Sequence, residues 1–159
     1  FPRILVPLAV VIGGGVDFLI SFVILLGMVL FYDRTFTSNI VWLPLILMMC
    51  LSLITGLTLW LSALDVQFRD IRAAIPFLLQ VWMFATPIMY PSTIIPGYLK
   101  QFYYLNPLVP LIELFRWALL GGSLPPIESI VTAASLSVLI LLSGLLFFNK
   151  IQGTLVDRV

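Results

Sequence analysis

The sequence has no histidine, one cysteine and few charged residues. Lys and Arg contribute 8 of its 159 residues and Asp and Glu contribute 7, so 9% are charged, against about 25% in soluble domains. Without histidine, the chain lacks the commonest acid–base residue and metal ligand. Cys50 alone excludes a disulfide within these residues and any redox chemistry that needs a cysteine pair. The net charge of +1 gives no indication of nucleic-acid binding.

Motifs for nucleotide binding and hydrolysis are absent as well. No G-x-x-x-x-G-K-[ST] loop is found, so the chain does not bind ATP in that way. No G-x-S-x-G elbow is found, and a catalytic triad would lack its histidine. We therefore expect no catalytic residue, no metal site and no cofactor on this chain.

Apolar residues dominate instead, at 62% of the sequence. A soluble core does not hide so much apolar surface, so lipid is the expected solvent. Four stretches are long enough to span a bilayer, at about 4–30, 40–64, 73–90 and 130–148. In lipid such segments form helices, because a helix satisfies its own backbone. The expected fold class is an all-α integral membrane protein with four transmembrane helices and a short re-entrant helical hairpin.

The basic residues between the spans predict the orientation of the chain. Five lie in the head, the second connector and the tail, and three lie in the other connectors: Arg3, Arg69, Arg72, Lys150 and Arg158 against Arg34, Lys100 and Arg116. Cytoplasmic connectors carry the excess of Lys and Arg. Both ends are therefore predicted in the cytoplasm. Because no basic region with a cleavage site precedes the first apolar run, we expect no signal peptide, and we expect the polypeptide to extend before Phe1.

The hairpin is predicted within the connector 91–126, at about 97–122. An aromatic helix precedes Asn106-Pro107, which interrupts it because the residue before proline avoids the helical region. A second helix follows and is expected to stop at Gly121-Gly122. Both helices are too short to span a membrane and too apolar for water. They are expected to dip into the membrane from the extracytoplasmic side and return.

Asp17 lies midway along the first span, after three glycines that permit close helix approach. A charge at that depth usually faces protein or a water path. One interpretation therefore predicts that its carboxyl lies on a helix interface or a pore wall. Alternatively, it makes a structural hydrogen bond to a neighbouring helix or is protonated.

The stretch DVQFRDIR joins the second and third spans and holds four charges, Asp65, Arg69, Asp70 and Arg72. Three interpretations remain open. It is a solvated loop, a contact surface for a cytoplasmic partner, or a lipid-phosphate site in which arginines bind phosphate. A metal-dependent enzyme would need more acidic ligands than this stretch contains.

The extracytoplasmic connector supplies the remaining candidates. Its aromatic residues form either an interfacial belt or a stacking surface for sugar rings along a pathway: Tyr98, Phe102, Tyr103 and Tyr104. Glu113 and Arg116 are three residues apart and are expected to pair. With Trp117, they are expected to stabilise the second hairpin helix at the lipid headgroups, or to form a simple surface ion pair.

Three blocks of the sequence resemble the permease subunit of ABC type-2 polysaccharide exporters, which include O-antigen, capsule and teichoic acid export permeases. The blocks are FPRILVPLAVVIGGGVDFLISF, LSALDVQFRDIRAAIPFLLQVWMFATPIMYP and LNPLVPLIELFRWALLG. They occur in the family's order, and the resemblance covers nearly the whole chain. The tail KIQGTLVDRV resembles the family's polar cytoplasmic ending, but less closely than the three blocks resemble theirs.

The resemblance implies a six-span permease of the bacterial cytoplasmic membrane that works as a homodimer. Residues 1–159 would then be the C-terminal part of one transmembrane domain, with two spans before Phe1. It also implies a separate ABC ATPase subunit that binds ATP and Mg²⁺, a polyprenyl-pyrophosphate-linked glycan as substrate, and gate helices in the hairpin. On this basis Arg69 and Arg72 would attract pyrophosphate at the cytoplasmic mouth, held in place by Asp65 and Asp70.

Three other functions compete with that interpretation. A purely structural membrane anchor would not need Asp17 at mid-membrane or a re-entrant hairpin. An ABC type-2 exporter of drugs or lipids shares the six-span plan. A smaller connector with few aromatic residues would favour that function, so the aromatic connector here argues against it. A membrane enzyme acting on polyprenyl phosphates needs a catalytic constellation that the sequence lacks.

Overall fold

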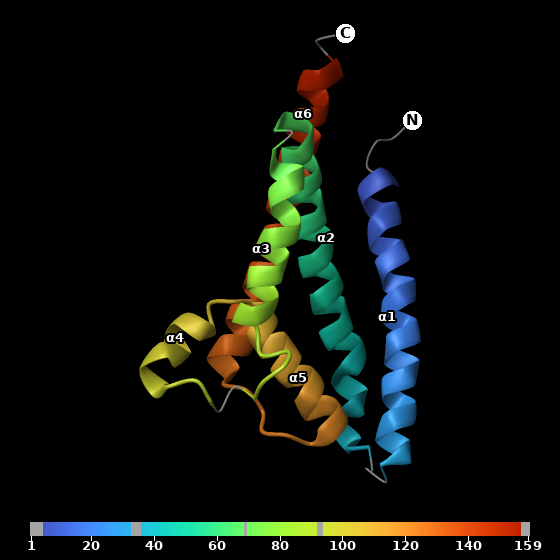
Figure 1. Ribbon diagram of the computed structural model, residues 1–159, viewed down its shortest axis with the longest axis vertical. Helices are drawn as coiled ribbons and strands as arrows, with labels where there is room; N and C mark the ends of the chain where they lie inside the picture. Colours follow the sequence, from blue (N-terminus) through green and yellow to red (C-terminus); the bar gives the residue numbers. More distant parts are fainter. Residues whose placement is uncertain (1–4, 33–35, 69, 92–93, 157–159) are drawn as a thin grey trace.

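The computed structural model describes residues 5–32, 36–68, 70–91 and 94–156, which form helices joined by turns and short irregular segments. Four helices run along the long axis in Figure 1: α1 (Leu5–Phe31), α2 (Leu43–Gln67), α3 (Ile71–Ala85) and α6 (Ile127–Val156). The short helix η1 (Ser38–Trp42) precedes α2. Three small elements lie at one end of the molecule: η3 (Gly97–Leu99), α4 (Lys100–Tyr103) and α5 (Leu108–Leu120). The all-α fold class is confirmed.

Three of the four predicted spans are helices long and apolar enough to cross a membrane. They are Leu5–Phe31, Ser38–Gln67 and Ile127–Ile151. The fourth, predicted at about 73–90, falls on α3, which has 15 residues. At 1.5 Å per residue α3 is about 22 Å long, short of the roughly 30 Å hydrocarbon core. The helix ends because Thr86, which precedes a proline, is extended, with φ −107° and ψ 141°.

The two ends of the molecule differ in character (Figure 1). The start of α1, the junction of α2 and α3 and the end of α6 lie together at the upper end, here called the charged end. The helices α4 and α5 lie at the lower end, here called the hairpin end. This arrangement places the predicted charged connector and the predicted hairpin far apart along the long axis.

The helices α2 and α6 make the most extensive contact in the molecule. Their backbones meet where Gly56 faces Leu141 and Gly144 faces Gly56. A Cβ atom at Gly56 would lie 2.6 Å from the Leu141 nitrogen, and one at Gly144 would lie 2.7 Å from the Gly56 oxygen. Small residues let membrane helices approach in this way.

Side chains on either side of that crossing fix the register of α2 against α6. Trp60 stacks on Phe147 with ring centroids 4.3 Å apart, and its indole nitrogen donates to the Ser143 hydroxyl at 3.1 Å. Below the crossing, Leu53 of α2 joins Leu111 and Ala118 of α5 in a buried core.

The prediction that the glycines of the first span mediate close helix approach is not met within the described part of this chain. A Cβ atom added at Gly13, Gly14 or Gly15 would have no described neighbour within 4 Å, so that part of α1 stands away from the other helices. The helix α1 as a whole has few buried residues, Pro7 and Val29.

The predicted pair of short helices is confirmed, with a break at Asn106-Pro107. The first part is the turn η3 followed by α4, and the second is α5, which begins after Pro107. Gly121 ends α5 in the left-handed conformation, with φ 71°, as the predicted stop requires. A Cβ there would also lie 2.8 Å from the Thr37 hydroxyl. Both the backbone conformation and the lack of space therefore favour glycine at this position.

Candidate functional site

At the charged end, Asp65 and Arg72 form a two-point ion pair. The Arg72 Nε donates to Asp65 Oδ1 at 2.9 Å, and Nη2 donates to Oδ2 at 2.6 Å. The pair joins the last turn of α2 to the first turn of α3. Both side chains are accessible, Arg72 at 79% and Asp65 at 27%, so the pair lies at the surface. The prediction that Asp65 holds an arginine is confirmed for Arg72.

Asp70, the third of these charges, is exposed and precedes α3 without a side-chain capping hydrogen bond. Arg69 lies outside the described residues.

At the hairpin end, Asn106 links three segments of the chain. Its Oδ1 accepts from the Trp82 indole nitrogen at 3.0 Å and from the Leu108 amide at 3.1 Å. Its Nδ2 donates to the Thr86 hydroxyl at 3.0 Å, and that hydroxyl donates to the Trp82 carbonyl at 2.8 Å. Thr86 is fully buried. The side chain of Asn106 therefore fixes the end of α3 against the start of α5.

Arg116 of α5 holds the segment that follows α3. Its Nη2 donates to the carbonyls of Pro87 at 2.7 Å and Ile88 at 3.1 Å, and its Nη1 donates to that of Tyr90 at 3.4 Å. These carbonyls lie in the turn after α3, outside regular helical hydrogen bonding, and a guanidinium with five donors satisfies several at once.

The predicted Glu113–Arg116 pair is wrong, because each residue has other partners. Arg116 points to the carbonyls after α3, while Glu113 accepts from the Tyr104 hydroxyl, at 3.1 Å to Oε2 and 3.5 Å to Oε1. Helical spacing brings two side chains near each other but does not prevent a nearer partner from another segment.

Tyr104 and Tyr103 are less exposed than Tyr98 and Phe102, the other two aromatic candidates. Burial and the neighbouring Glu113 carboxylate raise the pKa of Tyr104 to about 12, so its hydroxyl stays protonated and donates. Burial also raises the pKa of Tyr103 above its usual range, with Tyr90 adding to the rise. The Tyr103 hydroxyl is enclosed, yet no hydrogen bond of ordinary geometry joins it to another described residue. Tyr98 and Phe102 are exposed, at 77% and 71%.

A pocket of about 380 Å³, here called the hairpin pocket, opens between α4, α5 and the segment before α6. It brings together most of the predicted hairpin candidates, namely Tyr104, Glu113, Arg116 and Trp117. The predicted aromatic group is therefore divided: Tyr104 lines this pocket, and Phe102 and Tyr103 line a separate hollow with Asn106.

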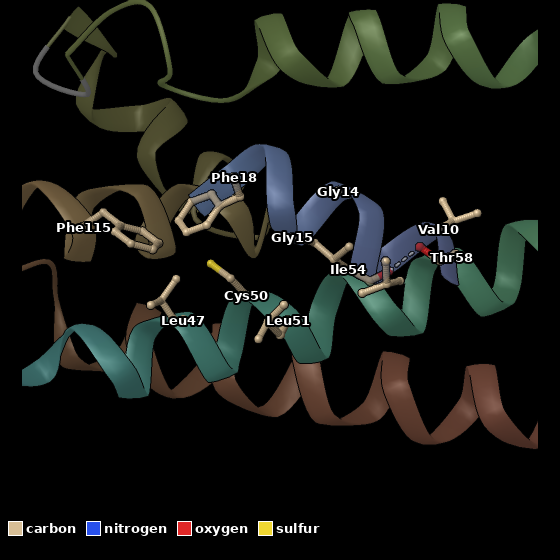
Figure 2. Close-up of a pocket in the computed structure, with 11 residues that line it drawn as sticks. Val10, Gly14, Gly15, Phe18, Leu47, Cys50, Leu51, Ile54, Thr58 and Phe115 are labelled. Atoms are coloured by element: carbon tan, nitrogen blue, oxygen red, sulfur yellow. Dashed lines mark hydrogen bonds between the residues drawn. The ribbon is translucent and has the colours of Figure 1, made fainter. Parts of the chain in front are cut away.

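A second cavity of about 380 Å³, here called the apolar groove, lies between α1 and α2. Figure 2 shows Gly14 and Gly15 on one side, Leu47, Cys50 and Ile54 on the other, and Phe18 beside Phe115 at one end. The lining is almost entirely apolar. Here the glycines of the first span leave space rather than a contact.

Asp17 lies on the open face of α1. Its side chain is exposed, and its carbonyl accepts from the Ser21 hydroxyl at 2.9 Å. Among the residues that the structure describes, Asp17 therefore lies on no helix interface.

Sequence reasoning missed Trp82 and Thr86 as partners of Asn106, and Lys100 as a residue of the hairpin pocket. The Asn106-Pro107 sequence predicts only a break in the backbone. The signal for the side-chain hydrogen bonds of Asn106 was a polar residue at a turn in an otherwise apolar connector. Within the described ranges, no three His, Cys, Asp or Glu side chains gather as a metal site.

Comparisons with known proteins agree with this architecture. A family model described as ABC-2 type transporter matches residues 5–120. The O-antigen export system permease protein RfbA of Myxococcus xanthus is 31% identical over 152 residues, which are 94% of this chain and 58% of that protein. A protein of the same name from Klebsiella pneumoniae is 28% identical over 153 residues, which are 96% of this chain and 59% of the relative. The chain thus spans less than two thirds of the length of these curated relatives.

Proposed function

The chain belongs to the ABC-2 type transporter family, and we propose that it forms part of the membrane permease of an ATP-driven exporter of lipid-linked polysaccharide. The observation that carries this proposal is the similarity of nearly the whole chain to permeases named for O-antigen export. The long apolar helices and the aromatic hairpin suit such a role. The substrate class is a glycan on a polyprenyl-pyrophosphate carrier.

The proposed topology has four membrane crossings in this chain, within the C-terminal part of one transmembrane domain. The segment 71–90 makes the third crossing, with α3 extended by the turn that Arg116 binds. The hairpin end lies on the extracytoplasmic side and re-enters the membrane. The charged end, with both ends of this chain, lies in the cytoplasm of a bacterial cell. The excess of basic residues in those segments supports this orientation.

The proposed partners follow from the chemistry that the chain lacks. No nucleotide-binding loop is present in the sequence, so ATP and Mg²⁺ would bind a separate ABC ATPase and this chain would catalyse nothing itself. A second copy of the permease is proposed beside the open faces of α1 and α3, where Asp17 and Gln80 are exposed. An ionisable side chain in a membrane helix faces protein or water rather than lipid.

The two ends of α3 give the proposed mechanism its physical basis. No residue of α3 is buried, so packing along its length holds it weakly. Polar contacts hold it instead, through Arg72 at the charged end and through Trp82 at the hairpin end. We propose that a movement at the cytoplasmic mouth, where the ATPase and the lipid pyrophosphate bind, reaches the hairpin through this helix.

A complementation experiment tests the function. The gene is deleted in its host, and surface polysaccharide is measured by immunoblot with and without the gene restored. Deletion is expected to remove surface polysaccharide and to leave lipid-linked glycan inside the cell. Inactivating the ATPase partner is expected to do the same. Normal surface polysaccharide after deletion, in a host without a second such permease, would refute the proposal.

A further inference from the structure

The hairpin pocket contains a buried carboxylate with unused hydrogen-bonding capacity. Glu113 is 9% exposed, and a carboxylate accepts about four hydrogen bonds. The Tyr104 hydroxyl supplies one donor. Arg116, which also lines the pocket, directs its donors to the carbonyls after α3. A buried carboxylate is costly unless donors surround it, so this pocket favours a ligand rich in donors.

The other walls of the pocket restrict the kind of ligand. Trp117 contributes an aromatic ring, and Leu124, Pro125 and Pro126 contribute apolar surface. Lys100 adds an ammonium donor. The ligand must therefore present hydroxyl donors and an apolar face at once. A pyranose ring does so, because its hydroxyls point outward while its C–H groups gather on its faces.

The size of the pocket suits a small ligand. Its volume of about 380 Å³ is within the range of roughly 300 to 1,000 Å³ of small-molecule sites. The surrounding elements also keep its shape, because Arg116 and Asn106 fix α5 to the end of α3. The apolar groove has a similar volume but offers no comparable set of polar groups.

We propose that the hairpin pocket binds a sugar ring, with hydroxyls donating to Glu113 and one apolar face against Trp117. The proposal rests on the proposed function in one respect, namely that a glycan passes the hairpin end. It adds a binding site whose lining residues all come from one chain. One sugar unit would be held there weakly while the glycan moves on.

Binding of neutral sugars to the full chain in lipid nanodiscs tests the pocket. Methyl α-pyranosides of glucose, galactose, mannose and rhamnose are used as probes in saturation-transfer NMR. At least one is expected to bind wild-type protein. Glu113→Gln, which keeps the shape and removes the charge, is expected to weaken binding about tenfold. Glu128→Gln is the matched control, since Glu128 is an exposed carboxylate on α6 outside the pocket, and it is expected to bind as wild type does.

A second variant separates loss of the site from loss of the fold. Ser123 lines the pocket on its exposed connecting segment, so Ser123→Trp is expected to fill the space, and it replaces neither partner of the Tyr104–Glu113 hydrogen bond. It is expected to abolish sugar binding while the thermal transition of the protein is unchanged. Unaltered sugar binding by either Glu113→Gln or Ser123→Trp would overturn the proposal. So would an absence of binding by all four sugars, or binding of inorganic phosphate alone, which would make the pocket a headgroup site.

Different results would contradict the pocket proposal and the proposed export function. If the restored gene exports polysaccharide but the protein binds none of the sugars, the pocket proposal is wrong and the exporter stands. If the sugars bind, and both Glu113→Gln and Ser123→Trp reduce this binding as expected, the pocket proposal stands even where deletion leaves surface polysaccharide intact.

Discussion

Single polar residues determine the structure of the hairpin end. Arg116 binds three carbonyls that lie 26 to 29 residues before it in the chain, and Asn106 binds the side chains of Trp82 and Thr86. In both cases the side chain satisfies groups at the end of α3, where regular helical hydrogen bonding stops. These residues act through the number and direction of their donors and acceptors, so conservative replacements are expected to fail.

Replacing Arg116 by Lys tests this dependence on direction. Lysine keeps the charge but loses the planar fork, so it cannot reach the Pro87 and Tyr90 carbonyls together. We expect the free energy of unfolding to fall by about 1–3 kcal/mol, measured by denaturant titration in detergent. Lys100→Arg is the control, because Lys100 is exposed, and is expected to change stability by less than about 0.5 kcal/mol. Equal stability of Arg116→Lys and wild type would show that charge alone matters here.

At the level of helices, contacts differ sharply from pair to pair. The helices α2 and α6 meet backbone to backbone at Gly56 and Gly144, whereas α3 is held to α2 chiefly at one end by Asp65 and Arg72. The first arrangement does not tolerate added side-chain atoms, because backbone atoms of the facing helix lie directly opposite each glycine. The second is a surface ion pair, which salt screens.

A methyl group at Gly56 is expected to disrupt the α2–α6 contact. In Gly56→Ala the new Cβ would lie 2.6 Å from the backbone nitrogen of Leu141, so the helices must separate. We expect a loss of about 1–3 kcal/mol in the free energy of unfolding. Gly27→Ala in α1 is the matched control, because no described atom lies within 4 Å of its Cβ position. It should be neutral or slightly stabilising, as alanine favours a helix interior over glycine. A Gly56→Ala protein as stable as Gly27→Ala would contradict the close contact.

The Asp65–Arg72 pair is tested by exchanging its charges. Asp65→Asn and Arg72→Gln alone are expected to make the connection between α2 and α3 more sensitive to chymotrypsin. The exchange Asp65→Arg with Arg72→Asp is expected to restore resistance at low salt, and high salt should reduce all these differences. If the protease sensitivity of the exchanged protein equals the sum of the effects of the two single changes, the pair does not join the helices.

Apart from Asp17, the charged residues that the structure describes lie toward the two ends of the molecule. The exposed Asp70 lies at the charged end, and the exposed Tyr98 lies just before α4 at the hairpin end. Between them runs α3, which is shorter than the hydrocarbon core is thick. The proposed third crossing therefore depends on residues 86–90 as well as on the helix.

Cysteine labelling tests that crossing. Cys50 is the single cysteine, so Cys50→Ser gives a background without thiols. In that background we expect an impermeant maleimide on intact spheroplasts to label Tyr98→Cys and not Asp70→Cys, with the reverse result on inverted vesicles. The unlabelled Cys50→Ser protein is the control. Labelling of both positions from the same side would exclude a crossing at residues 71–90.

The sequence by itself determined the properties that depend on local composition. Long apolar runs specify helices for lipid, Asn106-Pro107 and Gly121 specify where the short helices break and stop, and the two charges Asp65 and Arg72 are close enough along the chain to pair. Backbone geometry and solvent preference act over a few residues, so they can be read in order along the chain.

Tertiary structure decided which residues meet. Gly13 to Gly15 and Gly56 all lie in long apolar runs, yet among the described glycines Gly56 and Gly144 are the ones at a backbone crossing, because that depends on how α2 and α6 pack. Glu113 and Arg116 had the spacing of a pair, but donors and acceptors from other segments lay nearer. Distance in space selects the partner of a polar group, and helical spacing supplies only one of the candidates.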